Sequence, residues 1–223
     1  MKHILRNYFK LPLYLVVLIG FGAAQAGSFE DYFSAIQRGD ARTVSQLLAR
    51  GFDVNTTDAQ GQHGLYLAFR ATAPAVSQVL LKAPKLDVNA LTPKGESALM
   101  MACIQGELEL VDALIKKGAD VNKTGWTPLH YAASTGQVNV IKLLIEEHAY
   151  IDAESPNGST PLMLASMYGS PESVRLLLDE GADPGLKNQQ GLTALEFAQR
   201  ASRPDAIEMM TKALRQQRAT GKW

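Results

Sequence analysis

The sequence predicts an all-α solenoid of about six helix-turn-helix units, joined by extended β-turn loops and closed by terminal units that act as caps. Two recurring phrases support this prediction. The first opens on a glycine and returns about every 33 residues, at Gly61, Gly95, Gly125, Gly158 and Gly191. The second reads Gly-Ala-Asp-Val-Asn at 118–122 and keeps the same interval. Such a period is typical of stacked units that contact only their neighbours and present a long binding surface.

Residues 1–26 are expected to form a cleaved secretory signal peptide. Three basic residues precede residue 11, an apolar stretch follows over 11–21, and Ala24-Gln25-Ala26 supplies the small residues of a cleavage site. A membrane anchor is the alternative, but the apolar stretch is shorter than the roughly 20 residues that span a bilayer. We therefore expect no stable membrane anchor after cleavage.

Residues 27–223 are expected to form one repeat domain. Its units are approximately 28–57, 58–91, 92–122, 123–154, 155–187 and 188–218. The first and last units lack the full phrase, as terminal repeats that face water do, so both are predicted to be caps. The second unit is the least regular, because Thr72 stands where other units have a glycine. We expect it to be the softest part of the array.

Each central unit contains signals for two short helices. In the fourth unit, Thr127 is a suitable N-cap, Pro128 suits the first helical position, and Gly136 ends the helix. Apolar residues spaced by three and four over 138–145 then predict a second, amphipathic helix with one buried face. In other units a glycine such as Gly181 follows the second helix, where a left-handed residue is favoured.

These residues carry a family resemblance. Thr127 to Ala132 reads Thr-Pro-Leu-His-Tyr-Ala, which resembles the signature of ankyrin repeats, and Gly118 to Asn122 resembles the ankyrin loop. The resemblance covers roughly residues 28–218. It implies a protein-binding module, and a version with a signal peptide resembles exported, periplasmic bacterial ankyrin-repeat proteins that help or inhibit partners in the cell envelope.

Charge and cysteine content exclude several classes of function. Without residues 1–26 the chain loses three basic residues and no acidic ones, which leaves an excess of about three acidic residues. This balance does not favour nucleic acid or an anionic membrane surface as a partner. The single Cys103 excludes an internal disulfide, so the fold must rely on packing. A compact signal and no disulfide suit the periplasm, with secretion as the alternative location.

The candidate catalytic residues have structural explanations. His130 belongs to the repeated phrase, where ankyrin resemblance implies a turn-stabilising hydrogen bond, and Cys103 aligns with Ala133 at a small, packed position. His63 and His148 lack ligand partners at metal spacing. No phosphate-binding loop, paired-carboxylate motif or zinc signature is present. We therefore expect no enzyme activity, no cofactor, no metal and no catalytic residue.

The resemblance also suggests where a partner binds. In ankyrin-like units, the residue after the opening glycine and the two residues before the turn glycine line the concave face. In this sequence these positions give Arg70, Glu96, Ile104, Gln105, Trp126, Ser134, Thr135, Ser159, Met167 and Tyr168. Ile104, Trp126, Met167 and Tyr168 are the expected anchors, because large apolar and aromatic residues carry most of the affinity at interfaces. The alternative is that Trp126 folds over a neighbouring repeat and Met167 packs between helices.

The loop before Gly125 is unusually short. Only Lys123 and Thr124 separate Asn122 from Gly125, so this loop is about three residues shorter than the one before Gly158. A projecting finger is therefore missing from the middle of the row, which predicts a notch that admits part of a partner. The alternative is a neutral deletion.

Together these features predict a non-enzymatic periplasmic module, monomeric on its own, that docks a partner protein on its concave face to inhibit, protect or assist it. The alternative is a peptide-, glycan- or small-molecule-binding protein, or an enzyme, that uses the same groove.

Cleavage at the predicted site gives the first testable expectation. The mature protein should begin at Gly27, because small residues at Ala24 and Ala26 are those that the signal peptidase accepts. Intact-mass spectrometry of protein purified from its native host measures this directly. Recovery of a form that retains Met1 in the membrane fraction would contradict it.

Overall fold

The computed structural model describes residues 27–220, so the predicted signal peptide lies outside the described residues. The first helix covers 27–38. It is followed by α2 (Ala41–Ala49), α3 (Gly64–Arg70), α4 (Pro74–Leu81), α5 (Ala98–Gln105), α6 (Leu108–Lys116), α7 (Pro128–Thr135), α8 (Val138–Glu146), α9 (Pro161–Tyr168), α10 (Pro171–Asp179), α11 (Ala194–Arg200) and α12 (Pro204–Thr220). Within 27–220 the only β-pairing is a pair of isolated bridges, so the predicted all-α class is confirmed.

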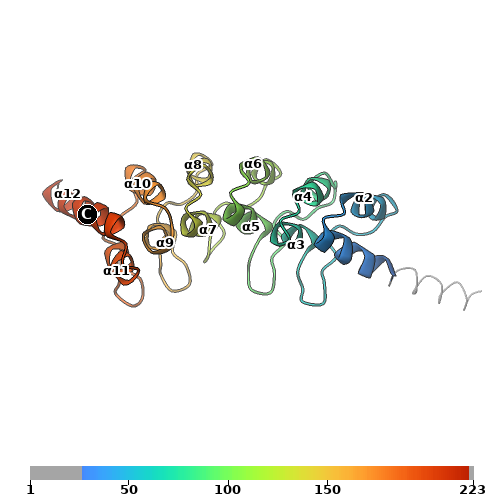
Figure 1. Cartoon of the computed structure of the whole chain (residues 1–223), viewed down its shortest axis with the longest axis horizontal. Coiled ribbons are helices and arrows are strands. Elements are labelled where there is room, and N and C mark those ends of the chain that lie inside the picture. The colour runs from blue at the N-terminus through green and yellow to red at the C-terminus, as the bar shows by residue number, and fades with distance from the viewer. Residues whose placement is uncertain (1–26, 221–223) are drawn as a thin grey trace, which may run out of the picture.

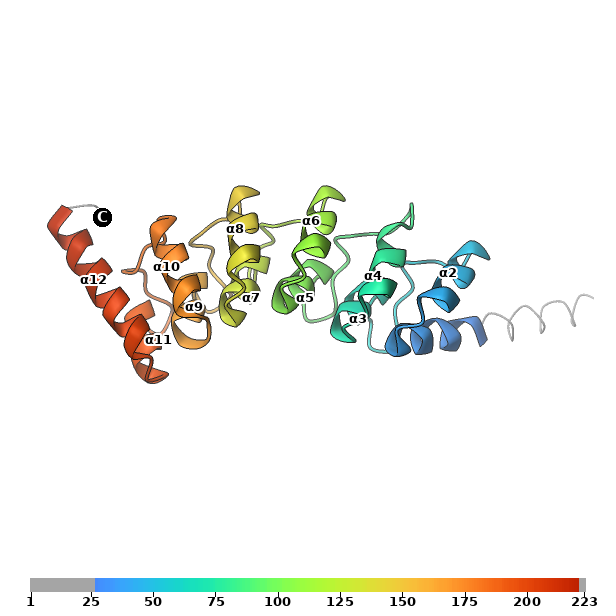
Figure 2. The same ribbon diagram turned by 45° about the horizontal axis from the view of Figure 1, so that its top comes forward.

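The helices lie in two parallel rows (Figures 1 and 2). The inner row contains the first helix, α3, α5, α7, α9 and α11, and the outer row contains α2, α4, α6, α8, α10 and α12. Extended loops project beside the inner row, below it in Figure 1. This is the predicted solenoid of six helix pairs. None of the helices within 27–220 is long and apolar enough to cross a membrane.

Local sequence signals set the helix boundaries as expected. Thr127 and Thr160 are the N-caps of α7 and α9, with a proline at the start of each helix. Gly136 ends α7 in the left-handed region, with φ of 69°. In the second unit Thr72 adopts φ of 50°, so a threonine occupies the left-handed turn that Gly39, Gly106 and Gly136 occupy in three other units, and Ser202 does the same in the last unit with φ of 54°.

The core runs without interruption along the array, between the two rows. Leu129, Ile141, Leu144 and Leu162 are among its fully buried side chains, and they come from successive helices of both rows. Cys103 is also fully buried, and desolvation raises the pKa of its thiol well above the ordinary value, so the thiol stays protonated. Its expected role as an inert core residue fits this environment.

His130 joins one repeat to the next. Its Nδ1 accepts the backbone N–H of Thr127 at 3.2 Å, which places the ring proton on Nε2, and Nε2 donates to the Ser159 carbonyl oxygen at 2.9 Å. Burial lowers the pKa of His130 to about 4, despite the opposing hydrogen bond to Ser159, so the ring is neutral at pH 7. The expected structural role of this histidine is thus confirmed.

Asparagines in the loops that follow the outer-row helices α2, α4 and α6 join neighbouring units, and we call this series the asparagine ladder. Asn55, Asn89 and Asn122 each donate a side-chain N–H to a carbonyl in the next unit and accept a backbone N–H from that same unit. The nitrogen–oxygen distances are 2.8 to 2.9 Å. Each amide therefore uses both its donor and its acceptor to hold neighbouring loops in register.

The ladder changes at Asp152. The carboxylate accepts the backbone N–H of Asp183, at 3.1 and 3.3 Å, but an ionised carboxylate has no proton to donate to the Gly181 carbonyl. Burial raises the pKa of Asp152, and the charge of Asp183 adds to this shift. One of the two bonds made at the other ladder positions is therefore missing at this junction.

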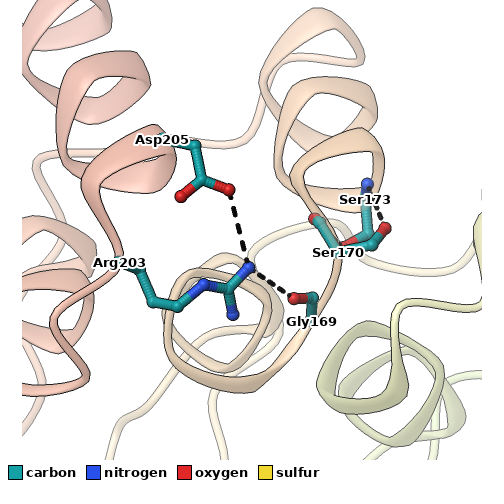
Figure 3. A network of polar contacts seen from close by, with 5 residues as sticks. All are labelled: Gly169, Ser170, Ser173, Arg203 and Asp205. Atoms are coloured by element: carbon teal, nitrogen blue, oxygen red, sulfur yellow. Dashed lines mark hydrogen bonds and ion pairs between the residues drawn. The ribbon is translucent and has the colours of Figure 1, made fainter.

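The last unit is held by a different contact. Figure 3 shows the Arg203 guanidinium donating to the Gly169 carbonyl oxygen at 2.8 Å. A carboxylate oxygen of Asp205 lies 3.8 Å from the same guanidinium. Nearby, the Ser170 hydroxyl accepts the backbone N–H of Ser173 at 3.1 Å. A Cβ atom on Gly169 would lie 2.5 Å from the Ala133 carbonyl oxygen, so close packing of successive turns requires glycine here. The outer helix of this unit, α12, has 17 residues, whereas α10 has 9.

Replacing Asp152 by asparagine should stabilise the protein. The amide would keep the bond from Asp183 and add a donor to the Gly181 carbonyl, for a gain of about 1 kcal/mol in the free energy of unfolding. Urea unfolding at pH 7 measures this. The difference from the wild type should shrink as the pH falls through the raised pKa of Asp152, because a protonated acid can itself donate. The reciprocal variant Asn122→Asp is the control and should lose stability. An Asp152→Asn protein that is no more stable than the wild type would show that a hydrogen bond to the Gly181 carbonyl adds nothing to stability.

Candidate functional site

The predicted partner-binding residues gather along the inner row, near the ends of its helices. Arg70 is the last residue of α3, Ile104 and Gln105 end α5, Ser134 and Thr135 end α7, and Met167 and Tyr168 end α9. All are exposed or half-buried, and Tyr168 is 62% exposed. We call this surface the inner face.

Ser159 is a correction to the predicted set. It is only 1% exposed, its carbonyl oxygen accepts from His130 at 2.9 Å, and its hydroxyl lies 3.4 Å from the Asn188 amide nitrogen. The equivalent residue Trp126 is half-buried. Ser159 is small enough to be enclosed by the contacts between repeats, so its side chain has almost no surface to offer a partner.

Several polar residues of the predicted set are already engaged within the fold. The side-chain amide of Gln105 donates to the Phe69 carbonyl oxygen of the preceding unit. The hydroxyls of Ser134 and Thr135 donate to the Tyr131 carbonyl oxygen at 2.8 and 3.1 Å. These side chains therefore hold the helix ends as well as lying on the inner face.

Trp126 lies against its own repeat. Its ring meets the His130 ring edge to face, with centroids 5.3 Å apart and planes at 78°. This arrangement partly matches the alternative explanation for Trp126, although the contact is with its own unit rather than a neighbour. The ring remains half-buried, so part of it faces solvent.

The sequence-based set missed three residues of the inner face. Tyr131, Leu164 and Phe197 are half-buried and occupy equivalent positions in successive units, one residue after the histidine position of the phrase. Tyr131 and Leu164 lie three and four residues before the predicted pair of their units, and residues at that spacing share a helix face. Phe197 is the equivalent residue of the last unit, for which the predicted set contains no pair. The signal was available, because the same period that located Met167 and Tyr168 places a large apolar or aromatic residue at this position.

A carboxylate with two hydrogen-bonded neighbours lies on the same face. The Tyr66 hydroxyl donates to Oε2 of Glu96 at 2.7 Å, and the Thr92 hydroxyl lies 3.4 Å from the same oxygen. Burial, followed by the bond to Glu96, raises the pKa of Tyr66 to about 12. The Arg70 guanidinium lies 5.9 Å from the centre of the Tyr66 ring and donates to Gln62 at 3.0 Å.

The loop before α7 is shorter than its neighbours, as Figure 1 shows. The loops before α5 and α9 close with the backbone bonds Thr92 N–H to Glu96 and Ser155 N–H to Ser159, and the hydrogen bonds found within 27–220 include no equivalent between 123 and 127. Lys123 instead donates its Nζ to the Thr124 carbonyl at 2.9 Å. The structure therefore contains the shortened loop that the sequence predicts. Its role in binding stays a prediction.

A separate cleft of about 820 Å³ lies between α10 and α12, away from the predicted residues. Its walls carry acidic and basic side chains, among them Arg175, Asp179, Asp205, Glu208 and Lys212. Within 27–220, no group of three or more His, Cys, Asp or Glu side chains lies close enough together to hold a metal ion.

Stacked helix pairs, loops that project beside the inner row, and an inner face that is accessible to solvent together define a repeat protein of the ankyrin type. The chain belongs to the ankyrin-repeat family. The family description "Ankyrin repeats (3 copies)" matches residues 32–124 and 75–155, and "Ankyrin repeats (many copies)" matches 148–198. Ankyrin repeats are generally non-enzymatic, protein-binding modules.

Curated relatives match this chain over only part of their own length. The chain is 36% identical over 130 residues to palmitoyltransferase AKR1 of Lachancea kluyveri, which covers 56% of this chain and 18% of that protein. It is 40% identical over 81 residues to protein phosphatase 1 regulatory subunit 27 of Mus musculus, covering 35% of this chain and 53% of that protein. The chain thus spans about half or less of each.

A solved structure matches over nearly its whole length. It is a chain from a complex titled "Bd0816 Predatory Endopeptidase from Bdellovibrio bacteriovorus in complex with immunity protein Bd3460". The TM-score is 0.71 and the sequence identity 27%, and the match covers 82% of this chain and 97% of that chain. The solenoid is therefore a fold that occurs in a complex between two proteins.

Trp126 should contribute less to stability than a core residue. Truncation to alanine removes a half-buried ring and an aromatic contact worth about 0.5–1.5 kcal/mol beyond the area it buries. Leu144→Ala, at a fully buried position, should cost about 2–5 kcal/mol. Urea unfolding of both variants provides the comparison. An equal loss of stability would mean that Trp126 serves mainly to hold the repeat together.

Proposed function

We propose that this chain is a non-enzymatic periplasmic module that docks a partner protein on its inner face and thereby inhibits, protects or assists that partner. One observation carries the proposal: large apolar and aromatic side chains follow one another along the inner face without being buried in the core. Ile104, Trp126, Met167 and Tyr168 are the predicted members, and Tyr131, Leu164 and Phe197 extend the row. We call these seven residues the inner-face strip.

The strip has the composition of an interface. Tryptophan, tyrosine, phenylalanine and methionine are enriched where proteins meet, and a few such residues usually supply most of the affinity. Tyr168 is exposed and the other six members are half-buried, with Ile104, Tyr131 and Phe197 packed partly against the core. Apolar surface that a protein leaves open often marks an interaction site. Within 27–220, Tyr168 is one of five exposed large apolar side chains, and it is 62% exposed.

The surface around the strip is organised before any partner arrives. Gln105, Ser134 and Thr135 are tied by hydrogen bonds within the array, and Trp126 is braced by His130. A surface whose side chains are already ordered loses less conformational entropy on binding. This supports docking of a folded partner against a largely rigid face.

The comparison with solved structures supports a protein as the partner. The matched chain comes from a complex of an endopeptidase with an immunity protein, in which one protein is held by another. The proposed periplasmic location rests on the sequence of residues 1–26, and a partner would then be sought among envelope proteins.

The proposal is tested by affinity purification of the tagged mature chain from the periplasm of its native host after mild cross-linking. We expect a stoichiometric protein partner that Trp126→Ala binds about 30-fold more weakly, a loss of about 2 kcal/mol. Tyr150→Ala is the matched control, since Tyr150 is 68% exposed but lies in the loop after α8, in the register of the asparagine ladder. Equal weakening by both variants would contradict docking on the inner face.

Lengthening the short loop tests the notch separately. Three residues inserted between Lys123 and Thr124 should leave the thermal midpoint nearly unchanged, because surface loops tolerate insertions at small entropic cost. Binding of the captured partner should weaken, since the longer loop would occupy the gap. Unchanged affinity for the partner would show that the notch has no role in binding. Enzymatic turnover, or tight binding of a small molecule by the purified wild-type chain, would favour the alternative function of a ligand-binding protein or enzyme.

A further inference from the structure

Glu96 is an oriented carboxylate with unused capacity to accept hydrogen bonds. The Tyr66 hydroxyl donates to its Oε2 at 2.7 Å, and the Thr92 hydroxyl approaches the same oxygen at 3.4 Å. The backbone N–H of Glu96 in turn donates to the Thr92 hydroxyl at 3.2 Å, which fixes the residue at the base of its loop. Among the hydrogen bonds of residues 27–220, none falls on Oε1. The half-buried side chain of Glu96 is therefore held at one carboxylate oxygen, while the other accepts no hydrogen bond from this part of the chain.

Two basic residues of the neighbouring units make other contacts. Arg70 stacks on Tyr66 and donates to Gln62, and Lys123 donates to the Thr124 carbonyl. The ion pairs found within 27–220 join Lys116 to Asp112, Lys142 to Glu146 and Arg203 to Asp205. Glu96 takes part in none of them, so its negative charge has no partner within 4 Å in this part of the chain.

Two tyrosines interact with this charge. Tyr66 belongs to the preceding unit and donates its hydroxyl to Glu96. Tyr131 belongs to the following unit, and its pKa is raised first by burial and then by the charge of Glu96. The Tyr66 ring is only 5% exposed and the Arg70 guanidinium lies over it, 5.9 Å from its centre, so the ring that a partner can reach here is that of the half-buried Tyr131.

A guanidinium fits this arrangement better than an ammonium. It is planar, less strongly hydrated, and able to stack on tyrosine while it donates to a carboxylate. The loop that follows the one bearing Glu96 is the shortened loop before α7, so a full-length finger does not flank Glu96 on that side. A long side chain from a docked partner can approach from there.

We propose that Glu96, with Tyr66 and Tyr131, is the receptor for an arginine side chain that the partner protein presents to the inner face. The inference deepens the proposed function and rests on it for the partner, but the site itself can be tested without one. Glu96 supplies the charge, Tyr66 orients the carboxylate, and the half-buried Tyr131 ring offers a face on which the guanidinium can stack. The inner-face strip supplies apolar area, and this site selects the partner by charge.

The experiment uses two short probes and the mature chain. Acetyl-Gly-Arg-Gly-amide and its uncharged match acetyl-Gly-citrulline-Gly-amide are titrated separately into isotopically labelled protein, and two-dimensional NMR follows the Trp126 indole and neighbouring amides. The wild type should bind the arginine probe at least tenfold more tightly than the citrulline probe, and this preference should decline with added salt. Glu96→Gln, which keeps the shape and the acceptor for Tyr66, should lose the preference.

Two further variants keep the outcome interpretable. Glu172→Gln removes an exposed carboxylate from the first turn of α10 in the outer row and should retain the wild-type preference. Tyr66→Phe should weaken arginine binding while leaving some preference, because the carboxylate stays charged but loses its orienting bond. Equal binding of the two probes by the wild type, no binding of either, or an unchanged preference in Glu96→Gln would overturn the proposal.

The two proposals fail in different ways. If no stoichiometric partner depends on Trp126, the proposed function fails whatever the probes do. If a partner is captured and Trp126→Ala weakens its binding but Glu96→Gln does not, docking on the inner face is supported. The arginine receptor is then contradicted.

Discussion

Each helix pair has an apolar face that it can bury only against the next pair, and this dependence on neighbours governs the whole structure. Leu129 and Leu162 are fully buried because successive inner helices cover them, and His130 reaches across the junction to the Ser159 carbonyl. A neutral, buried histidine suits this task, since its two nitrogens satisfy one acceptor role and one donor role at once. The close approach of Gly169 to Ala133 belongs to the same constraint, because any larger residue would separate two stacked units.

Since stability comes from the junctions, residues that face away from them are free to serve another purpose. The inner face uses this freedom. Its polar members are tied into the helix ends, whereas large apolar side chains such as Tyr168 remain open to solvent. A solenoid can expose a residue such as Tyr168 because its core lies between the two rows of helices and does not depend on what the inner face carries.

Local departures from the repeat are tolerated for the same reason. Asp152 replaces a ladder asparagine, the loop before α7 lacks its hairpin bond, and Thr72 occupies a left-handed turn that three other units give to Gly39, Gly106 and Gly136. Each change affects one junction and leaves the others intact. The array can therefore carry a shortened loop before α7 without losing its order.

The period and the local chemistry of turns determined most of the fold from sequence alone. Thr127, Pro128 and Gly136 fix the ends of α7 through their own backbone preferences, and spacing by three and four assigns the buried face of α8. Only the tertiary structure decided how individual side chains are used. It enclosed Ser159, turned Trp126 onto His130, and brought Tyr66 of the preceding unit to Glu96. The repeat period places equivalent residues on one face, but exposure and pairing depend on side-chain contacts between units about 30 residues apart, which no local preference encodes.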